Sequence, residues 1–326
     1  MVFPTFAAGV AFMREVAAER AQPASIRLVD NEQFQFGQSL KARPSNPFLT
    51  AVKDTLQKAY VTKVAGFNPD TMVAATLMFE GKPDVVARHQ AQVYALGRKH
   101  GGMVGGEANG IRGYFLTYMI AYVRDFAMRY WFLAESFETS VPWGQVMAVC
   151  ENTKATIRGA CRRHGVKGPI YVSCRVTQTY DTGACVYFYF GFMHKGLPDP
   201  LGVFSAVEGE ARSTILSLGG SLSHHHGIGK HRAQFLRNIL TPASAAAVRG
   251  AKAAVDPANV MGAANALFAP HAHGLGKATG HADAFNTPHA PTAYAPFAGE
   301  ASGGAALGAS VAAGMREFGD GAEAKL

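Results

Sequence analysis

The chain has 326 residues, 48% hydrophobic and 17% charged, so it can bury a sizeable core in one large or two modest domains. Lys and Arg number 31 against 23 Asp and Glu, and the resulting formal net charge of +8 favours anionic partners. Zinc-finger spacing, a basic stripe interleaved with aromatic residues and an Arg-rich tail are all missing, which argues against nucleic acid and for a phosphorylated small molecule.

Helical and extended patterns alternate through the first hundred residues. Apolar residues at helical spacing predict a helix over 3–20, and the run A-S-I-R-L-V-D at 24–30 predicts a short strand. We further predict a strand over 71–80, a helix over 83–100, and another strand or turn in the glycine-rich stretch 101–107.

The longest predicted strands lie in the middle of the chain. A helix over 114–131 precedes a strand over 132–141, and the next helix opens at Pro142, where proline suits a first turn. Residues 170–180 and 184–193 predict a hairpin of two long strands with D-T-G as its turn.

This hairpin determines the fold class that we expect. Adjacent long strands favour a largely antiparallel sheet, so we predict an α+β fold with helices packed on one face of the sheet. An amphipathic helix is predicted over 201–218, ending at Gly219 and Gly220. After Phe268 the composition shifts to Ala, Gly, His and Pro, which bury too little surface to offset ordering entropy, so residues 269–326 are predicted to be disordered.

Membrane spans and disulfides are not expected. The most apolar stretch, 114–134, is interrupted by Arg124, Asp125 and Arg129, and charges at the centre of a span are costly, so we predict a buried or half-buried helix there. The four cysteines stand singly without a C-x-x-C pair, which is typical of buried thiols in a reduced interior.

The most unusual motif is G-G-S-L-S-H-H-H-G-I-G-K-H-R, which contains His224, His225 and His226. Imidazole is a metal ligand, and an acid or base near neutral pH. Adjacent histidines suit one metal ion poorly because their side chains point in different directions, so we expect no metal. The glycines instead favour a tight bend where backbone N–H groups and nearby cations hold an anion or a flavin edge. A polar loop without function is the alternative.

Three further residues are candidates for chemistry. Tyr187 lies in the strand C-V-Y-F-Y-F. Its hydroxyl can act as a general acid or base. The alternative is that Tyr187 packs in the core, which is the more common role of alternating aromatic residues in a strand. Arg124 stands in an apolar helix, where a lone charge is costly, and either binds an anion or pairs with an acid such as Glu135 or Glu138. Arg27, in the first predicted strand, presents the same choice.

Five stretches resemble the alkyldihydroxyacetonephosphate synthases, and the resemblance runs from about Phe3 to Phe268. They are A-S-I-R-L-V-D-N-E-Q-F-Q-F-G, R-G-Y-F-L-T-Y-M-I-A-Y-V-R-D, E-S-F-E-T-S-V-P-W, C-R-V-T-Q-T-Y-D-T-G-A-C-V-Y-F-Y-F and G-G-S-L-S-H-H-H-G-I-G-K. The resemblance implies an FAD enzyme of the vanillyl-alcohol-oxidase type that works in ether-lipid synthesis. Such an enzyme exchanges the fatty acid of acyl-dihydroxyacetone phosphate for a long-chain fatty alcohol, through an adduct at flavin N5 and without net redox change.

The resemblance also implies roles for the candidate residues. Tyr187 matches the acid/base tyrosine of the family, and the three adjacent histidines match histidines needed for activity. Arg124 and Arg27 match arginines of the family, and we expect both to bind substrate. We expect Arg124 to bind the phosphate of the substrate or its leaving carboxylate.

Only the C-terminal, substrate-facing half of such enzymes is covered by the resemblance. We expect residues 1–50 to be the remnant of, or connection to, an FAD-binding domain. Residues 51–268 are expected to form the substrate or cap domain with the histidine loop, and 269–326 the disordered tail. The chain has no G-x-G-x-x-G after a predicted strand, so the main FAD-binding segment is expected to be absent.

A targeting signal is predicted at the C-terminus. Ala324, Lys325 and Leu326 are a close variant of Ser-Lys-Leu, which the peroxisomal import receptor reads. We therefore expect a peroxisomal or glycosomal location, and, in addition, a homodimer and peripheral association with a membrane.

Two other functions remain open. The chain is either an inactive remnant that only binds a partner subunit or the substrate, or part of an FAD-dependent hydroxy-acid oxidase or dehydrogenase. The triple histidine together with C-V-Y-F-Y-F favours the transferase over the oxidase.

Overall fold

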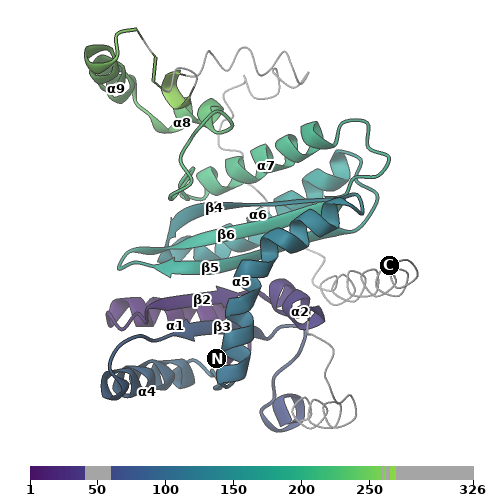
Figure 1. Ribbon diagram of the computed structural model, residues 1–326, viewed down its shortest axis with the longest axis vertical. Coiled ribbons are helices and arrows are strands. Elements are labelled where there is room, and N and C mark those ends of the chain that lie inside the picture. Colours follow the sequence, from purple (N-terminus) through teal and green to yellow (C-terminus); the bar gives the residue numbers. More distant parts are fainter. Residues whose placement is uncertain (41–59, 259, 262–264, 269–326) are drawn as a thin grey trace.

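A six-stranded sheet, in which every neighbouring pair is antiparallel, forms the centre of the computed structural model (Figure 1). The structure describes residues 1–40, 60–258, 260–261 and 265–268. The strand order is β1-β3-β2-β5-β6-β4. The strands are β1 Val2–Phe3, β2 Ser25–Val29, β3 Val73–Met78, β4 Phe132–Pro142, β5 Ile170–Thr179 and β6 Gly183–Met193. The predicted α+β fold with a largely antiparallel sheet is confirmed.

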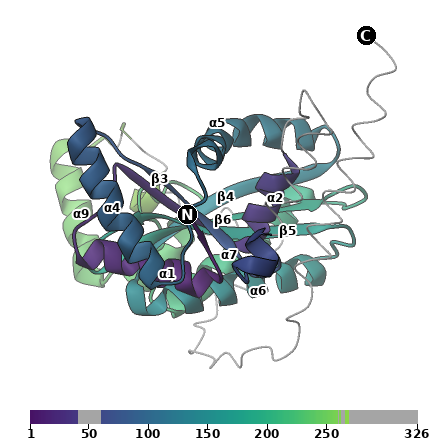
Figure 2. The ribbon, with the colours of Figure 1, turned by 90° about the horizontal axis from the view of Figure 1, so that it is seen from below.

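Helices cover the sheet unequally. They are α1 Phe6–Ala18, α2 Asn31–Ser39, α4 Pro83–Lys99, α5 Glu107–Met128, α6 Val146–Arg163, α7 Pro200–Ser217, α8 Leu236–Ile239 and α9 Pro242–Val255. Helices α1, α6 and α7 lie on one face, as predicted, whereas α5 crosses the opposite face (Figures 1 and 2). The sheet therefore has one densely covered face and one that is open beside α5.

Strand alternation separates the hydrophobic core from the open face. Phe188, Phe190 and Phe192 of β6 are at most 1% exposed, and the ring of Phe190 stacks on Phe204 of α7 with centroids 4.4 Å apart. Tyr187, in the alternate position, lies outside this core. The aromatic run C-V-Y-F-Y-F thus supplies core phenylalanines to one face and tyrosines to the other.

Helix termini explain where several of these elements begin. The Thr5 side chain accepts a hydrogen bond from the backbone N–H of Ala8 at the start of α1, and Asp199 accepts one from Gly202 at the start of α7. Proline occupies the first turn of α7, where its missing N–H costs no hydrogen bond.

One local prediction was wrong: helix α5 begins at Glu107 rather than at 114. The stretch 101–107, predicted as a strand or turn, contributes a turn at Gly101 and a bridge between Met103 and Val2. Helices α2 and α9 were not predicted. Glycines at the start of α5 lower its intrinsic helix propensity, and packing against β3 and β4 overrides them.

The sheet joins strands from both sides of the predicted domain boundary at residue 50. Ile26 of β2 pairs with Leu77 of β3, and Leu28 pairs with Val176 of β5. The division itself stays a prediction, because the boundary falls in 41–59, outside the described residues. The predicted disordered tail and the tripeptide Ala324-Lys325-Leu326 also lie outside them.

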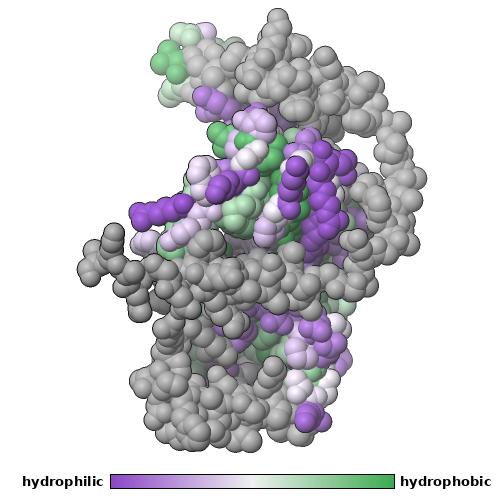
Figure 3. All heavy atoms as spheres, turned by 90° about the vertical axis from the view of Figure 1, so that its right-hand side faces the viewer, coloured by the Kyte–Doolittle hydropathy of each residue, from purple (hydrophilic) through white to green (hydrophobic). Residues whose placement is uncertain are grey.

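The prediction on the cysteines is confirmed. All four cysteines are buried and free. Among the helices that the structure describes, none is both long and apolar enough to cross a membrane. On the side of the molecule shown in Figure 3, hydrophilic residues lie beside hydrophobic ones over the described surface.

Candidate active site

The histidine motif forms a loop that is hydrogen-bonded to β4, one of the two edge strands of the sheet. The backbone N–H of Ser221 donates to the carbonyl of Ser140 at 2.8 Å, and Ser221 Oγ accepts from the N–H of Ser140 at 2.9 Å. Buried Arg212 of α7 donates to the carbonyl of Leu222 at 2.8 Å. Gly227 and Gly229 follow with φ values of +76° and +55°, which only glycine adopts easily. The glycine-framed bend expected from the sequence is therefore present.

Glu138 of β4 anchors this loop through hydrogen bonds to its side-chain carboxylate. Its side chain is fully buried. Its carboxylate accepts hydrogen bonds from Ser223 Oγ at 2.7 Å and from the backbone N–H groups of His224, His225 and His226 at 2.5, 3.4 and 3.0 Å. Burial by itself raises the pKa of Glu138, but these hydrogen bonds outweigh it and lower the pKa to about 2. An ionised carboxylate thus fixes three consecutive backbone units.

The anchored histidines join two tyrosines in a continuous hydrogen-bonded chain. The Tyr187 hydroxyl lies 2.6 Å from His225 Nε2, and His225 Nδ1 lies 2.7 Å from His224 Nδ1. His224 Nε2 then lies 2.8 Å from the hydroxyl of Tyr180, which is 44% exposed. Each imidazole uses both ring nitrogens, so the chain can pass a proton between Tyr187 and the surface. We call Tyr187, His225, His224 and Tyr180 the relay.

His226 contacts the inner end of the relay from a second side. Its Nε2 lies 3.2 Å from the Tyr187 hydroxyl, and its Nδ1 lies 3.6 Å from Glu138. Burial lowers the pKa of His226 and raises that of Tyr187. The Tyr187 hydroxyl is therefore a neutral phenol at neutral pH, and it sits between two imidazoles that can take its proton or return one.

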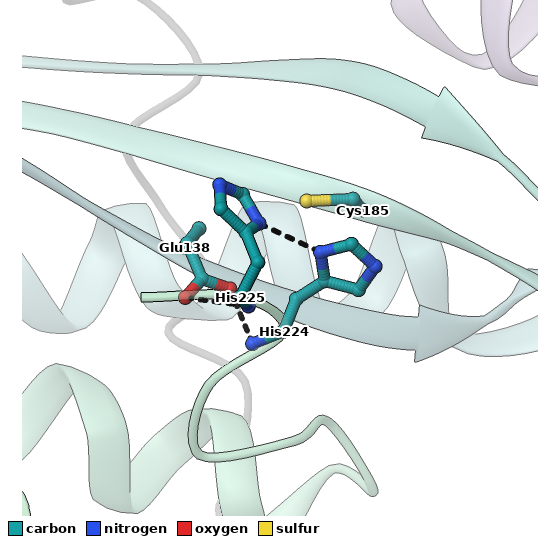
Figure 4. A group of neighbouring side chains, drawn as sticks. All are labelled: Glu138, Cys185, His224 and His225. Carbon is teal, nitrogen blue, oxygen red and sulfur yellow. Dashed lines mark hydrogen bonds between the residues drawn. The ribbon is translucent and has the colours of Figure 1, made fainter. Parts of the chain in front are cut away.

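Four potential metal ligands also meet here, as Figure 4 shows: Glu138, Cys185, His224 and His225, with one ligand atom of each within 4.8 Å of the others. The carboxylate and both imidazoles are already engaged by hydrogen bonds. Burial raises the pKa of the Cys185 thiol to about 11, so without a metal it stays protonated. Proton transfer is the chemistry that this group favours, and the absence of a metal stays a prediction.

The structure does not bring all predicted site residues together. Arg124 forms ion pairs with Glu135 at 3.1 Å and with Asp125 at 3.2 Å, so the pairing alternative is realised, with Glu135 rather than Glu138 as partner. Arg27 lies on the open face, with its guanidinium 4.9 Å from the ring centroid of Tyr114 on α5. A substrate-binding role for either arginine stays a prediction.

The sequence analysis overlooked Tyr180, the anchoring role of Glu138, and Arg175. Tyr180 directly precedes the hairpin turn, and nothing in the sequence links it to the histidines. Arg175 is different: like Arg27 it is a charge within an otherwise apolar strand, and the same criterion applied to β5 would have found it.

Comparison with known proteins identifies what this arrangement resembles. Residues 1–265 match the family model of the C-terminal domain of FAD-linked oxidases. An alkyldihydroxyacetonephosphate synthase of Caenorhabditis elegans is 45% identical over 266 residues, which are 82% of this chain and 44% of that protein. The synthase of Dictyostelium discoideum is 26% identical over 79% of this chain and 42% of its own length. The chain thus spans less than half the length of these relatives.

A solved structure supports the same fold. The structure of an alkyldihydroxyacetonephosphate synthase superposes with a TM-score of 0.58 and 22% sequence identity, over 80% of this chain and 43% of that one.

Proposed function

Because this chain belongs to the family of FAD-linked oxidase C-terminal domains, we propose that it forms the proton-transfer and substrate-facing part of an alkyldihydroxyacetonephosphate synthase. The relay carries this proposal. In the proposed reaction, acyl-dihydroxyacetone phosphate loses its fatty acid as a carboxylate and gains a long-chain fatty alcohol through a new carbon–oxygen bond. The fatty acid is ionised at neutral pH, so the proton of the alcohol must reach solvent in each turnover.

FAD is the cofactor of this family, and the donors on the open face suit its ring. A flavin ring presents carbonyl oxygens and ring nitrogens that accept hydrogen bonds. The exposed imidazoles of His225 and His226 and the hydroxyl of Tyr187 are groups of the donating kind, and because they bond to one another in the structure, a bound ring would take over one of these hydrogen bonds. When bound, FAD supplies the electron-accepting ring that this chemistry uses.

The residues of this chain handle the protons. Tyr187 Oη is the atom that exchanges a proton with the reacting carbon or oxygen, and His225 Nε2 receives that proton. His224 passes the charge on to Tyr180, which is open to water. His226 donates to Tyr187 when its hydroxyl is deprotonated, and Glu138 holds all three backbones so that these distances persist.

A chimaera tests the proposal. Residues 1–265 of this chain would replace the matching segment of the Caenorhabditis elegans synthase, and formation of the ether product would be measured. We expect a synthase that is active, and Tyr187→Phe or His226→Ala to lower its turnover at least about 100-fold, the range of one general acid–base contribution.

Two outcomes would contradict the proposal. Full activity of the Tyr187→Phe chimaera would remove this tyrosine from proton transfer. A chimaera that binds flavin but instead oxidises a hydroxy acid, with peroxide or a reduced acceptor as product, would replace the transferase by an oxidase.

A further inference from the structure

Arg175 of β5 lies on the open face, in the same cross-strand row as Tyr187 of β6 and Glu138 of β4. Its guanidinium carbon lies 5.2 Å from the ring centroid of Tyr187 and 4.9 Å from that of Tyr189. The two tyrosine rings are stacked with centroids 6.2 Å apart. The side chain is half-buried against these rings, next to the inner end of the relay.

The guanidinium of Arg175 has no counter-charge within the described part of the chain. Its Nε is buried without an acceptor, and no carboxylate of a described residue lies within ion-pair distance. Burial lowers the pKa of Arg175 below its ordinary value, but a guanidinium stays protonated at neutral pH. The nearest acid in the row, Glu138, is already saturated by the histidine loop.

The neighbouring titratable groups do not neutralise it either. Burial raises the pKa of Tyr189 to about 12 and that of Cys185 to about 11, and it raises the pKa of Tyr187 as well, so all three are uncharged at neutral pH. Arg27 shares this face, because Val29 of the same strand pairs with Arg175, and it adds a second positive charge. A desolvated cation beside another cation is costly unless an anion joins them.

We propose that Arg175 is a substrate-binding residue whose guanidinium holds an oxyanion, a phosphate monoester or a carboxylate, beside the hydroxyl of Tyr187. This rests on the proposed function, whose substrate carries a phosphate and releases a carboxylate. A guanidinium presents two parallel N–H donors that can form bidentate hydrogen bonds with either a phosphate or a carboxylate. Arg175 then orients the substrate so that its reacting carbon faces Tyr187.

Calorimetric titration of the full 326-residue chain tests this site without FAD or turnover. The probes are dihydroxyacetone phosphate for the phosphate, hexanoate for the carboxylate, and inorganic phosphate. The variants are Arg175→Gln, Arg175→Lys, and Arg88→Gln as a control that removes an exposed arginine of α4. We expect Arg175→Gln to weaken binding at least about 30-fold, Arg175→Lys to weaken it less, and Arg88→Gln to change it little.

The melting temperature separates a binding role from a structural one. If Arg175 only packs on the tyrosines, Arg175→Gln lowers the melting temperature and leaves binding as it was. If Arg175 instead binds an anionic ligand, Arg175→Gln melts at the wild-type temperature or higher, and dihydroxyacetone phosphate raises the melting temperature of the wild type alone.

Each outcome decides the proposal. Loss of phosphate binding alone assigns the site to the phosphate, loss of hexanoate binding alone to the carboxylate, and loss of both to a shared site. The proposal is overturned if the wild-type chain binds none of the three probes at millimolar concentration, or if Arg175→Gln leaves their binding unchanged. Binding at Arg175 with an inactive chimaera would instead overturn the proposed synthase function and keep this site.

Discussion

Glu138 shows how one buried side chain organises the candidate site. Its carboxylate takes four hydrogen bonds from the histidine loop and none from the arginine that the sequence suggested as its partner. Adjacent histidines alone would point in different directions. With their backbones held by one carboxylate, His224 and His225 contact each other, and His225 and His226 converge on Tyr187.

We predict that Glu138→Gln makes the protein less stable at neutral pH and flattens its response to acid. The pKa of Glu138 is lowered to about 2, so its ionised form stabilises the fold above the ordinary pKa of 4.5, and this contribution is lost as the pH falls from 4.5 to 2. The contribution amounts to about 3 kcal/mol. Urea unfolding at pH 7, 4 and 3 measures it. Glu80→Gln, at an exposed position, is the control, and an unaltered acid response in Glu138→Gln would contradict the prediction.

Tyr180 ends the relay, and its removal should be milder than that of Tyr187. We predict that Tyr180→Phe lowers turnover of the chimaera less than about tenfold, because water can replace an exposed hydroxyl as the last proton acceptor. The ratio of turnover in ordinary and heavy water should rise in this variant, since proton delivery then limits the rate more. Equal losses in Tyr180→Phe and Tyr187→Phe would argue against a directional chain.

At the scale of elements, the register of β4, β6 and β5 builds the site. Glu138 pairs with Tyr187, and Tyr187 pairs with Arg175, so three strands contribute one residue each to a single row. A shift of one residue in any strand would send that side chain to the opposite face, into the phenylalanine core. The long pairing of β4 with β6 therefore positions the candidate site as well as stabilising the sheet.

Gly183, at the start of β6, permits this pairing. A Cβ atom there would lie 2.4 Å from the carbonyl oxygen of Val141 and 3.0 Å from its carbonyl carbon, both in the backbone of β4. We predict that Gly183→Ala lowers the free energy of unfolding by about 1–3 kcal/mol, the usual cost of overpacking. Gly144→Ala, where a Cβ would meet nothing within 4 Å, is the matched control. Chemical denaturation compares them, and equal stabilities would show that the strands yield without cost.

At the scale of the molecule, a buried ion network ties the N-terminal part of the sheet to α6. Lys154 of α6 donates to Asp30 at 2.8 Å and to Glu32 at 3.0 Å, and Arg158 donates to Glu32 at 2.8 Å. Asp30 also accepts from the backbone N–H of Cys174 in β5 at 2.8 Å. Burial by itself lowers the pKa of Lys154, but the carboxylates of Asp30 and Glu32 raise it above its ordinary value.

We predict that Lys154→Met destabilises the protein by about 3–5 kcal/mol, because it leaves the buried carboxylate of Asp30 without its cation, beside a Glu32 that keeps only Arg158. Lys99→Met, which removes an exposed lysine from an ion pair with Glu15, should change stability little. Thermal unfolding followed by circular dichroism measures both. A small effect of Lys154→Met would mean that the network contributes orientation rather than stability.

Local patterns were enough to predict most of the elements and part of the candidate site. Periodicity predicted the long strands and most helices, because amphipathic spacing depends on the neighbouring residues alone. The motif around His224 and the tyrosine in C-V-Y-F-Y-F were identified by composition and resemblance. Four buried cysteines followed from their spacing.

Contacts between distant segments could be known only from the fold. Glu138 lies 86 residues before His224, and Tyr180 lies 44 residues before it, so no local pattern relates them. For Arg124 the sequence offered Glu135 and Glu138 as partners, and only the fold selects Glu135. For Arg175, only the fold shows that its buried Nε has no acceptor among the described residues. Hydrophobic spacing specifies which face of an element is buried, but the pairing of charges across that face depends on strand register and helix placement, which form only when the whole sheet assembles.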